Sequence, residues 1–222
     1  MQPPFATEQF MEVILRYNQT VWPIQILFYV GAVALLWLAV VSSRSSDRWV
    51  SGILAFFWAW MAVVYHWLFF TAITPAAWVF GALFLVQAVV FLAAGLFGDR
   101  LAFEFEGDAY GVIGAVFLAY GLLFYPIFGA LAGHTYPESP TFGLPCPTTI
   151  VTFGVLLWAS RRVPIHVVLI PAIWGLIGGS AAIQFAIPED YGLIVAGVLG
   201  TVLVLLKNRR LPTAAEVPVT EP

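Results

Sequence analysis

The sequence predicts an all-α, polytopic membrane protein, a bundle of seven transmembrane helices. Of the 222 residues, 61% are hydrophobic and only 9% are charged, and the mean hydropathy is +0.93. These values lie far outside the range of soluble domains. Several apolar runs exceed about 18 residues without a charge, which is enough helix to cross a hydrocarbon core of roughly 30 Å.

The chain is expected to have three parts. Residues 1–20 predict an amphipathic helix lying in the membrane interface, with Glu12 and Arg16 as an i,i+4 pair on its polar face. Residues 21–207 hold the transmembrane domain, and residues 208–222 predict a disordered cytoplasmic tail rich in proline and polar residues. The seven spans are predicted at about residues 21–42, 49–72, 76–97, 109–132, 147–162, 164–187 and 190–207.

The basic residues predict the orientation of the bundle. An odd number of spans places the two ends of the chain on opposite sides, and lysine and arginine concentrate on the cytoplasmic side of a membrane protein. Arg16 is the one basic residue on the N-terminal side. We therefore predict an outside N-terminus and a cytoplasmic C-terminus, because the remaining basic residues fall together: Arg44, Arg48, Arg100, Arg161, Arg162, Lys207, Arg209 and Arg210.

The fifth span is short. From Pro147 to Arg162 the chain supplies about 24 Å of helix at 1.5 Å per residue, less than the hydrocarbon thickness. Pro145 together with Pro147 disfavours an earlier start. We expect the loop before it, residues 134–146, to dip into the outer half of the membrane, which is tolerated where protein or a water-filled cavity covers the backbone. Short, proline-interrupted segments of this kind also mark binding sites in transporters, and local bilayer thinning is the alternative.

Polar side chains gather at the depth of this loop. Intramembrane polar groups usually face the bundle interior or a cavity, so these residues predict a binding site for a small solute or ion. Each also has a structural interpretation, as an interhelical hydrogen-bond partner or a packed aromatic residue. The candidate binding residues are Gln25, Tyr65, His66, Tyr125, His134, Cys146, Thr148, Thr149 and Gln184.

Cys146, the only cysteine, has an unusual predicted setting. A thiol at a helix N-terminus is stabilised as thiolate by the positive end of the helix dipole. Thiolate and imidazole suit a soft transition-metal ion, so Cys146, His66 and His134 are candidate metal ligands. A buried structural cysteine is the alternative. No acidic pair is expected within the spans, and Glu138 is the one carboxylate of the central loop.

The sequence also bears on partners. The sixth span carries a face of small residues, Gly175, Gly178, Gly179 and Ala182, which suits close helix packing. The expected partners are the lipid bilayer and a small solute or ion, and a homo-oligomer is left open. Nothing in the sequence forms a basic patch that could hold nucleic acid.

Several motifs resemble a bacterial family of multi-pass membrane proteins of unknown function. The resemblance covers most of residues 10–160 and implies a location in the bacterial inner membrane. It brings no assigned activity. The motifs are Trp22-Pro23-x-Gln25, Tyr65-His66-Trp67-x-Phe69-Phe70, Pro75-Ala76-Ala77 with Phe80-Gly81, Gly133-His134-x-Tyr136-Pro137, Pro140-x-Phe142-Gly143 and Pro145-Cys146-Pro147-Thr148-Thr149-Ile150.

Three classes of function stay open. Transport or permeation of a small solute or ion, with a soft metal as one cargo considered, is favoured by the dipping loop and the one-sided polar residues. A structural, sensory or accessory subunit also fits an aromatic-rich bundle. A membrane-embedded enzyme, the least favoured class, would use His66, His134, Glu138 and Cys146 as metal ligands or as acid, base and nucleophile. A retinal photoreceptor is disfavoured, because the only lysine, Lys207, lies at the cytoplasmic end.

Overall fold

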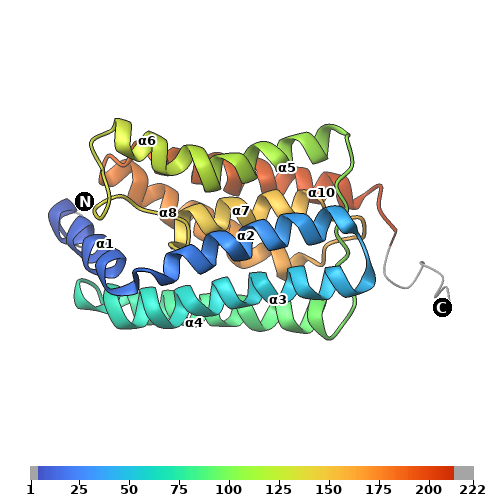
Figure 1. Cartoon of the computed structure of the whole chain (residues 1–222), viewed down its shortest axis with the longest axis horizontal. Coiled ribbons are helices and arrows are strands. Elements are labelled where there is room, and N and C mark those ends of the chain that lie inside the picture. The colour runs from blue at the N-terminus through green and yellow to red at the C-terminus, as the bar shows by residue number, and fades with distance from the viewer. Residues whose placement is uncertain (1–4, 213–222) are drawn as a thin grey trace.

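The structure is a computed structural model that describes residues 5–212, and within them it is all-helical. Its long helices run nearly side by side along the long axis of the molecule, and α1 lies obliquely across one end (Figure 1). The α-helices are α1 (Thr7–Val21), α2 (Ile24–Val41), α3 (Arg44–Trp60), α4 (Ala76–Phe91), α5 (Ala109–Ala119), α6 (Tyr125–Leu131), α7 (Pro145–Leu157), α8 (Ile165–Gln184), α9 (Tyr191–Val195) and α10 (Thr201–Asn208).

Six helical runs are long and apolar enough to cross a membrane. Their exposed surface is itself apolar, with Trp37, Leu131 and Leu176 each more than 60% exposed, as expected of helices that face lipid rather than water. The predicted long spans are confirmed as helices to within a few residues at most of their ends. The six runs are Ile24–Val41, Arg44–Ala72, Ala76–Leu96, Ala109–Leu131, Ile165–Gln184 and Pro188–Asn208.

Short π-helical segments interrupt four of these runs. They are η1 (Met61–Phe69) after α3, η3 (Leu92–Leu96) after α4, η4 (Tyr120–Phe124) between α5 and α6, and η6 (Ala196–Gly200) between α9 and α10. A π-helical turn breaks the regular i→i+4 hydrogen bonding and is frequent at functional sites. The sequence patterns did not predict these interruptions.

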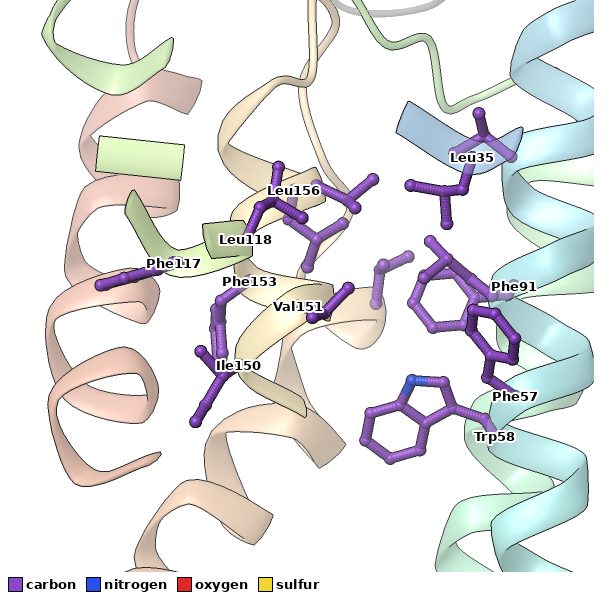
Figure 2. Close-up of a cluster of buried hydrophobic side chains, with 14 of the residues drawn as sticks. Leu35, Phe57, Trp58, Phe91, Phe117, Leu118, Ile150, Val151, Phe153 and Leu156 are labelled. Carbon is purple, nitrogen blue, oxygen red and sulfur yellow. The ribbon is translucent and has the colours of Figure 1, made fainter. Parts of the chain in front are cut away.

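The short helix α7 lies at the centre of the bundle, surrounded by the longer helices (Figure 1). Every residue from Pro147 to Leu157 is buried. Figure 2 shows side chains of α7, such as Val151 and Phe153, between Trp58 and Phe91 of the neighbouring pair on one side and Phe117 on the other. Threonines in α7 remain compatible with this core because their hydroxyls bond inside the protein.

The bounds of α7 correct the sequence prediction. The helix begins at Pro145, not Pro147, and ends at Leu157, so it is shorter than expected. The predicted start was wrong because Pro145 and Pro147 were taken to disfavour an earlier start of the helix. Both fall in the first helical turn, where the N–H groups have no intrahelical partner, so neither proline removes a helical hydrogen bond.

Helix α1 and the loop between α6 and α7 close one end of the bundle. Asn18 donates to the carbonyls of Pro137 (2.7 Å) and Ser139 (2.8 Å), and Tyr17 donates its hydroxyl to Gly143 (3.1 Å). Burial raises the pKa of Tyr17, which keeps the hydroxyl protonated as a donor. The apolar face of α1, with Val13, Ile14 and Val21 buried, packs on the protein. Its location in a membrane interface stays a prediction.

The loop after α6 enters the bundle before α7 begins. Its residue Phe142 is fully buried and packs edge-on against Phe57 at 5.2 Å between ring centroids. The later part of this loop, from Ser139 to Pro145, is mostly buried in protein, whereas Thr135, Tyr136 and Glu138 are exposed. The expected dip of the loop into the outer half of a membrane stays a prediction.

The opposite end is held by a cluster of arginines around Asp99. Arg48 contacts its carboxylate through Nε (2.8 Å) and Nη2 (2.9 Å), and Arg44 through Nη2 (2.6 Å). Arg161, which follows α7, donates to the Asp99 carbonyl at 3.1 Å. Arginines from the start of α3 and from the α7–α8 connection thus meet Asp99 of the α4–α5 connection at one end of the bundle, far from α1 (Figure 1).

Candidate functional site

A cavity of about 230 Å³ lies at the α1 end of the bundle, above the first turn of α7. Eight of its lining residues are aromatic: Phe5 and Phe10 at the start of the chain, then Tyr65, Phe70, Phe80, Tyr125, Trp174 and Phe185. The cavity reaches the surface between α4 and α8, where the lining residues Ala76, Ser180 and Gln184 are exposed. It is therefore a mostly apolar space with a few polar groups, the usual composition of a small-molecule site.

One charged side chain, Asp190, lines this cavity. It belongs to the short 3-10 turn Pro188–Asp190 that starts the last helical run. Asp190 is 3% exposed, and its Oδ1 accepts a short hydrogen bond from the Tyr125 hydroxyl. The Cys146 thiol at the start of α7 lies beside the same carboxyl group. A full charge in an apolar wall is costly unless neighbouring groups or a ligand compensate for it.

The neighbouring Glu189 is fully buried. Its Oε1 lies 2.7 Å from Nδ1 of His134, while its Oε2 has no hydrogen-bond partner among the described residues. Tyr120 donates to the Glu189 carbonyl at 2.8 Å. Gly129 makes room for the carboxylate, because a Cβ at that position would lie 3.2 Å from Oε1.

This acidic pair overturns one prediction. The sequence was interpreted as having no acidic pair within the spans, yet Glu189 and Asp190 begin the run Pro188–Asn208 and are buried. Two acidic residues after a proline between apolar segments are typical of a solvent-exposed turn. The signal that was missed is the short connection between α8 and the run Pro188–Asn208. It keeps both acidic side chains at the end of the bundle that α1 and the α6–α7 loop cover.

Four predicted site residues are brought together in the cavity. Tyr65, Tyr125, Cys146 and Gln184 all line it, although they come from η1, α6, α7 and α8. His134 joins the group indirectly, through its contact with Glu189.

The other candidates have structural contacts. Gln25 donates to Asn18 Oδ1 at 2.7 Å and so belongs to the network that anchors the loop. The Thr148 hydroxyl accepts from the Gly143 amide at 3.3 Å, and Thr149 donates to the Pro145 carbonyl at 2.8 Å. These three side chains hold the loop and the first turn of α7 in place.

His66 stands behind the cavity wall. It is fully buried between Phe84, 4.7 Å away between centroids, and Trp174 at 5.3 Å, and neither ring nitrogen has a hydrogen-bond partner among the described residues. Within residues 5–212 no group of three or more His, Cys, Asp or Glu side chains is arranged to hold a metal ion. The metal site proposed for Cys146, His66 and His134 therefore has no geometric support.

The comparison with known families identifies a family of unknown function, as the resemblance in the sequence led us to expect. A family described as a family of unknown function, DUF6064, matches residues 7–215. The chain belongs to DUF6064. No curated protein and no solved structure matches it. The DUF6064 match covers every element described above, from α1 to α10, so the cavity and the acidic pair both lie inside the family's domain.

Proposed function

We propose that this DUF6064 protein is a seven-span membrane protein, N-terminus outside, that binds a small solute in the cavity beside Asp190 and transports it. The cytoplasmic side would be the arginine-rich end, following the positive-inside rule. The chain makes seven crossings if α7 and its buried loop count as one crossing. His134, just after α6, contacts Glu189 at the cavity end, whereas Val163, just before α8, contacts Asn208 at the other end. The segment between them therefore passes from one end of the bundle to the other. The bacterial inner membrane is the proposed location.

The observation that carries the proposal is the cavity itself. Its volume, about 230 Å³, exceeds the roughly 150 Å³ that accommodates a benzene ring in an engineered cavity. It combines apolar walls with a few polar groups, among them the carboxyl group of Asp190, as ligand sites usually do. It lies at the end of the bundle that the basic residues predict to face outward, and its opening between α4 and α8 gives a solute a route in.

Two features favour movement of the solute over simple binding. The cavity ends on a half-length helix, α7, whose 13 residues cover about 20 Å, and short helices at a site are typical of transporters. The π-helical segment η1 carries the lining residue Tyr65, and η4 ends directly before the lining residue Tyr125. An irregular turn at these positions can shift more readily than a regular helix.

A second candidate function is sensing. The core below the cavity is packed, with Trp58 donating to the Thr152 hydroxyl at 3.1 Å across the α3–α7 contact. A solute that stays in the cavity would act as a signal and not as a cargo. The two functions make opposite predictions about solute movement.

The single cysteine gives a direct test. Cys146 lines the cavity, so a bound solute should slow its alkylation by N-ethylmaleimide in protein reconstituted into lipid nanodiscs. We would screen a library of small solutes for this protection and then measure uptake of each protecting solute into proteoliposomes. Cys146→Ala gives the background of the alkylation assay.

The outcomes separate the alternatives. Protection together with protein-dependent uptake supports transport. Protection without uptake contradicts transport and supports sensing. If no solute in the library protects Cys146, the cavity is not a solute site and both functions are rejected.

A further inference from the structure

We propose that the cavity binds a small organic cation, a substituted ammonium ion with apolar groups, whose charge sits between Asp190 and the aromatic wall. This inference rests on the proposed function, since it names the class of solute. It follows from the charge, the shape and the unused polar groups of the site.

The first step is the charge balance at this end of the bundle. Glu189 and Asp190 are both buried, and His134 is the one basic side chain that contacts either of them in the described chain. Arg16 lies on α1 but is exposed and paired with Glu12 at 2.9 Å. With both carboxyls ionised, His134 can offset at most one of the two negative charges, and a monovalent cation at Asp190 would neutralise the other.

The second step is the wall around Asp190. Aromatic rings attract cations through the negative charge of their faces, most strongly where water is excluded. Tyr65, Phe70, Phe80 and Trp174 line the cavity together with Asp190, and Trp174 stands edge-on to Phe80 at 5.4 Å between centroids. Aromatic cages of this composition suit ammonium groups that carry methyl or other apolar substituents.

The helix dipole acts in the opposite direction but is weaker. The N-terminus of α7 faces the cavity with a partial positive charge of about half an elementary charge. Pro145 and Pro147 in that first turn have no N–H to donate, which leaves Cys146 between them with the one amide. The full negative charge of Asp190 outweighs this dipole, so the net preference of the site is for cations.

A further polar atom points to a ligand that is more than a bare ammonium. The indole Nε1 of Trp174 has no oxygen or nitrogen acceptor in residues 5–212; its polar neighbour is the Cys146 sulfur, a weak acceptor, and the side chain is 7% exposed and lines the cavity. A buried N–H without an acceptor is costly. A hydroxyl or ether oxygen on the ligand would satisfy it.

The test compares a cation with its neutral isostere. The probes are benzyltrimethylammonium, which is charged at every pH, and neopentylbenzene, in which carbon replaces the nitrogen. Both are titrated onto purified protein in nanodiscs, with Cys146 protection as the readout. We expect the cation to bind at least about tenfold more tightly than the isostere, the discrimination that one charge contact of roughly 1.4 kcal/mol supplies.

Asp190→Asn removes the charge and keeps an oxygen acceptor for Tyr125. In this variant the cation should lose its advantage, while the neutral isostere binds as in the natural protein and so shows that the cavity is still formed. Glu138→Gln is the matched control, because Glu138 is an exposed carboxylate on the loop outside the cavity lining and its loss should change neither affinity.

The possible failures are distinguishable. Equal affinity of the two probes in the natural protein, or an unchanged preference in Asp190→Asn, overturns the cation proposal and leaves a neutral-solute site intact. If neither probe nor any library solute protects Cys146, the proposed function fails as well.

Discussion

Asn18 shows how one side chain can fix a long loop. It is fully buried, donates to two loop carbonyls and accepts from Gln25. Asn18→Ala would leave these groups without partners, and each buried unsatisfied group costs about 1–3 kcal/mol. We expect the free energy of unfolding of the variant to be lower by about 2–4 kcal/mol. In an unfolding titration in detergent, this loss appears as a lower midpoint concentration of denaturant.

The matched control is the next residue. Gln19 is exposed on α1, so Gln19→Ala should change the free energy of unfolding by less than about 0.5 kcal/mol. Similar stabilities of the two variants would show that the loop does not depend on Asn18.

Asp99 predicts a pH dependence at the other end of the molecule. The hydrogen bonds from Arg48 and Arg44 lower the pKa of its carboxyl from 3.8 to about 2. Because the folded pKa lies below the unfolded one, the contribution to stability is complete above pH 3.8 and is lost as the pH falls through 2. Thermal unfolding in detergent should show Asp99→Asn less stable than the natural protein at neutral pH, with the difference shrinking across that window.

The substitution suits its position. Asp99 has a left-handed φ of 49°, a conformation that asparagine tolerates well, so Asp99→Asn tests the charge without adding backbone strain. A stability difference that stays constant down to pH 2 would contradict the role assigned to the arginine contacts.

Among the elements, α8 and the last helical run make the closest approach. A Cβ on Gly175 would lie 2.7 Å from the Cα of Gly197, so backbone faces backbone. Gly175→Ala should force the helices apart and cost about 1–3 kcal/mol. Gly52→Ala is the control, because nothing lies within 4 Å of its Cβ position and alanine should stabilise that helix by about 0.5–1 kcal/mol. In a chemical unfolding experiment, a lower free energy of unfolding for Gly175→Ala and a higher one for Gly52→Ala would confirm the helix contact. Equal changes in the two variants would contradict it.

The elements also show which features the sequence could predict. Apolar run length predicted the long helices, and the spacing of Gly175, Gly178 and Gly179 predicted the packing face of α8, because both are local patterns. The π-helical segments and the burial of Glu189 and Asp190 depend on which elements meet at one end of the bundle. A charge next to a proline looks the same in a loop and in a covered site, so the acidic pair could not be recognised without tertiary contacts.

At the scale of the whole molecule, the two ends differ in charge and in shape. One end carries the cavity and the buried acidic pair, and the other carries the arginines around Asp99. If the bundle spans a membrane, the positive-inside rule orients it with the cavity outward. Cys146 provides a thiol at the cavity end of the bundle. Gly107, in the connection between α4 and α5, is exposed with open space around it and can carry an introduced cysteine at the other end.

This difference predicts the outcome of a labelling experiment in intact cells. A membrane-impermeant, cationic methanethiosulfonate reagent should modify Cys146 from outside, because the thiol lines the cavity and the proposed orientation opens this cavity outward. In the double variant Cys146→Ala, Gly107→Cys, the same reagent should react after the membrane is opened and not before. The reverse pattern would invert the orientation and place the cavity on the cytoplasmic side. Reaction of both thiols in intact cells would instead show that the seven-span path through α7 is wrong.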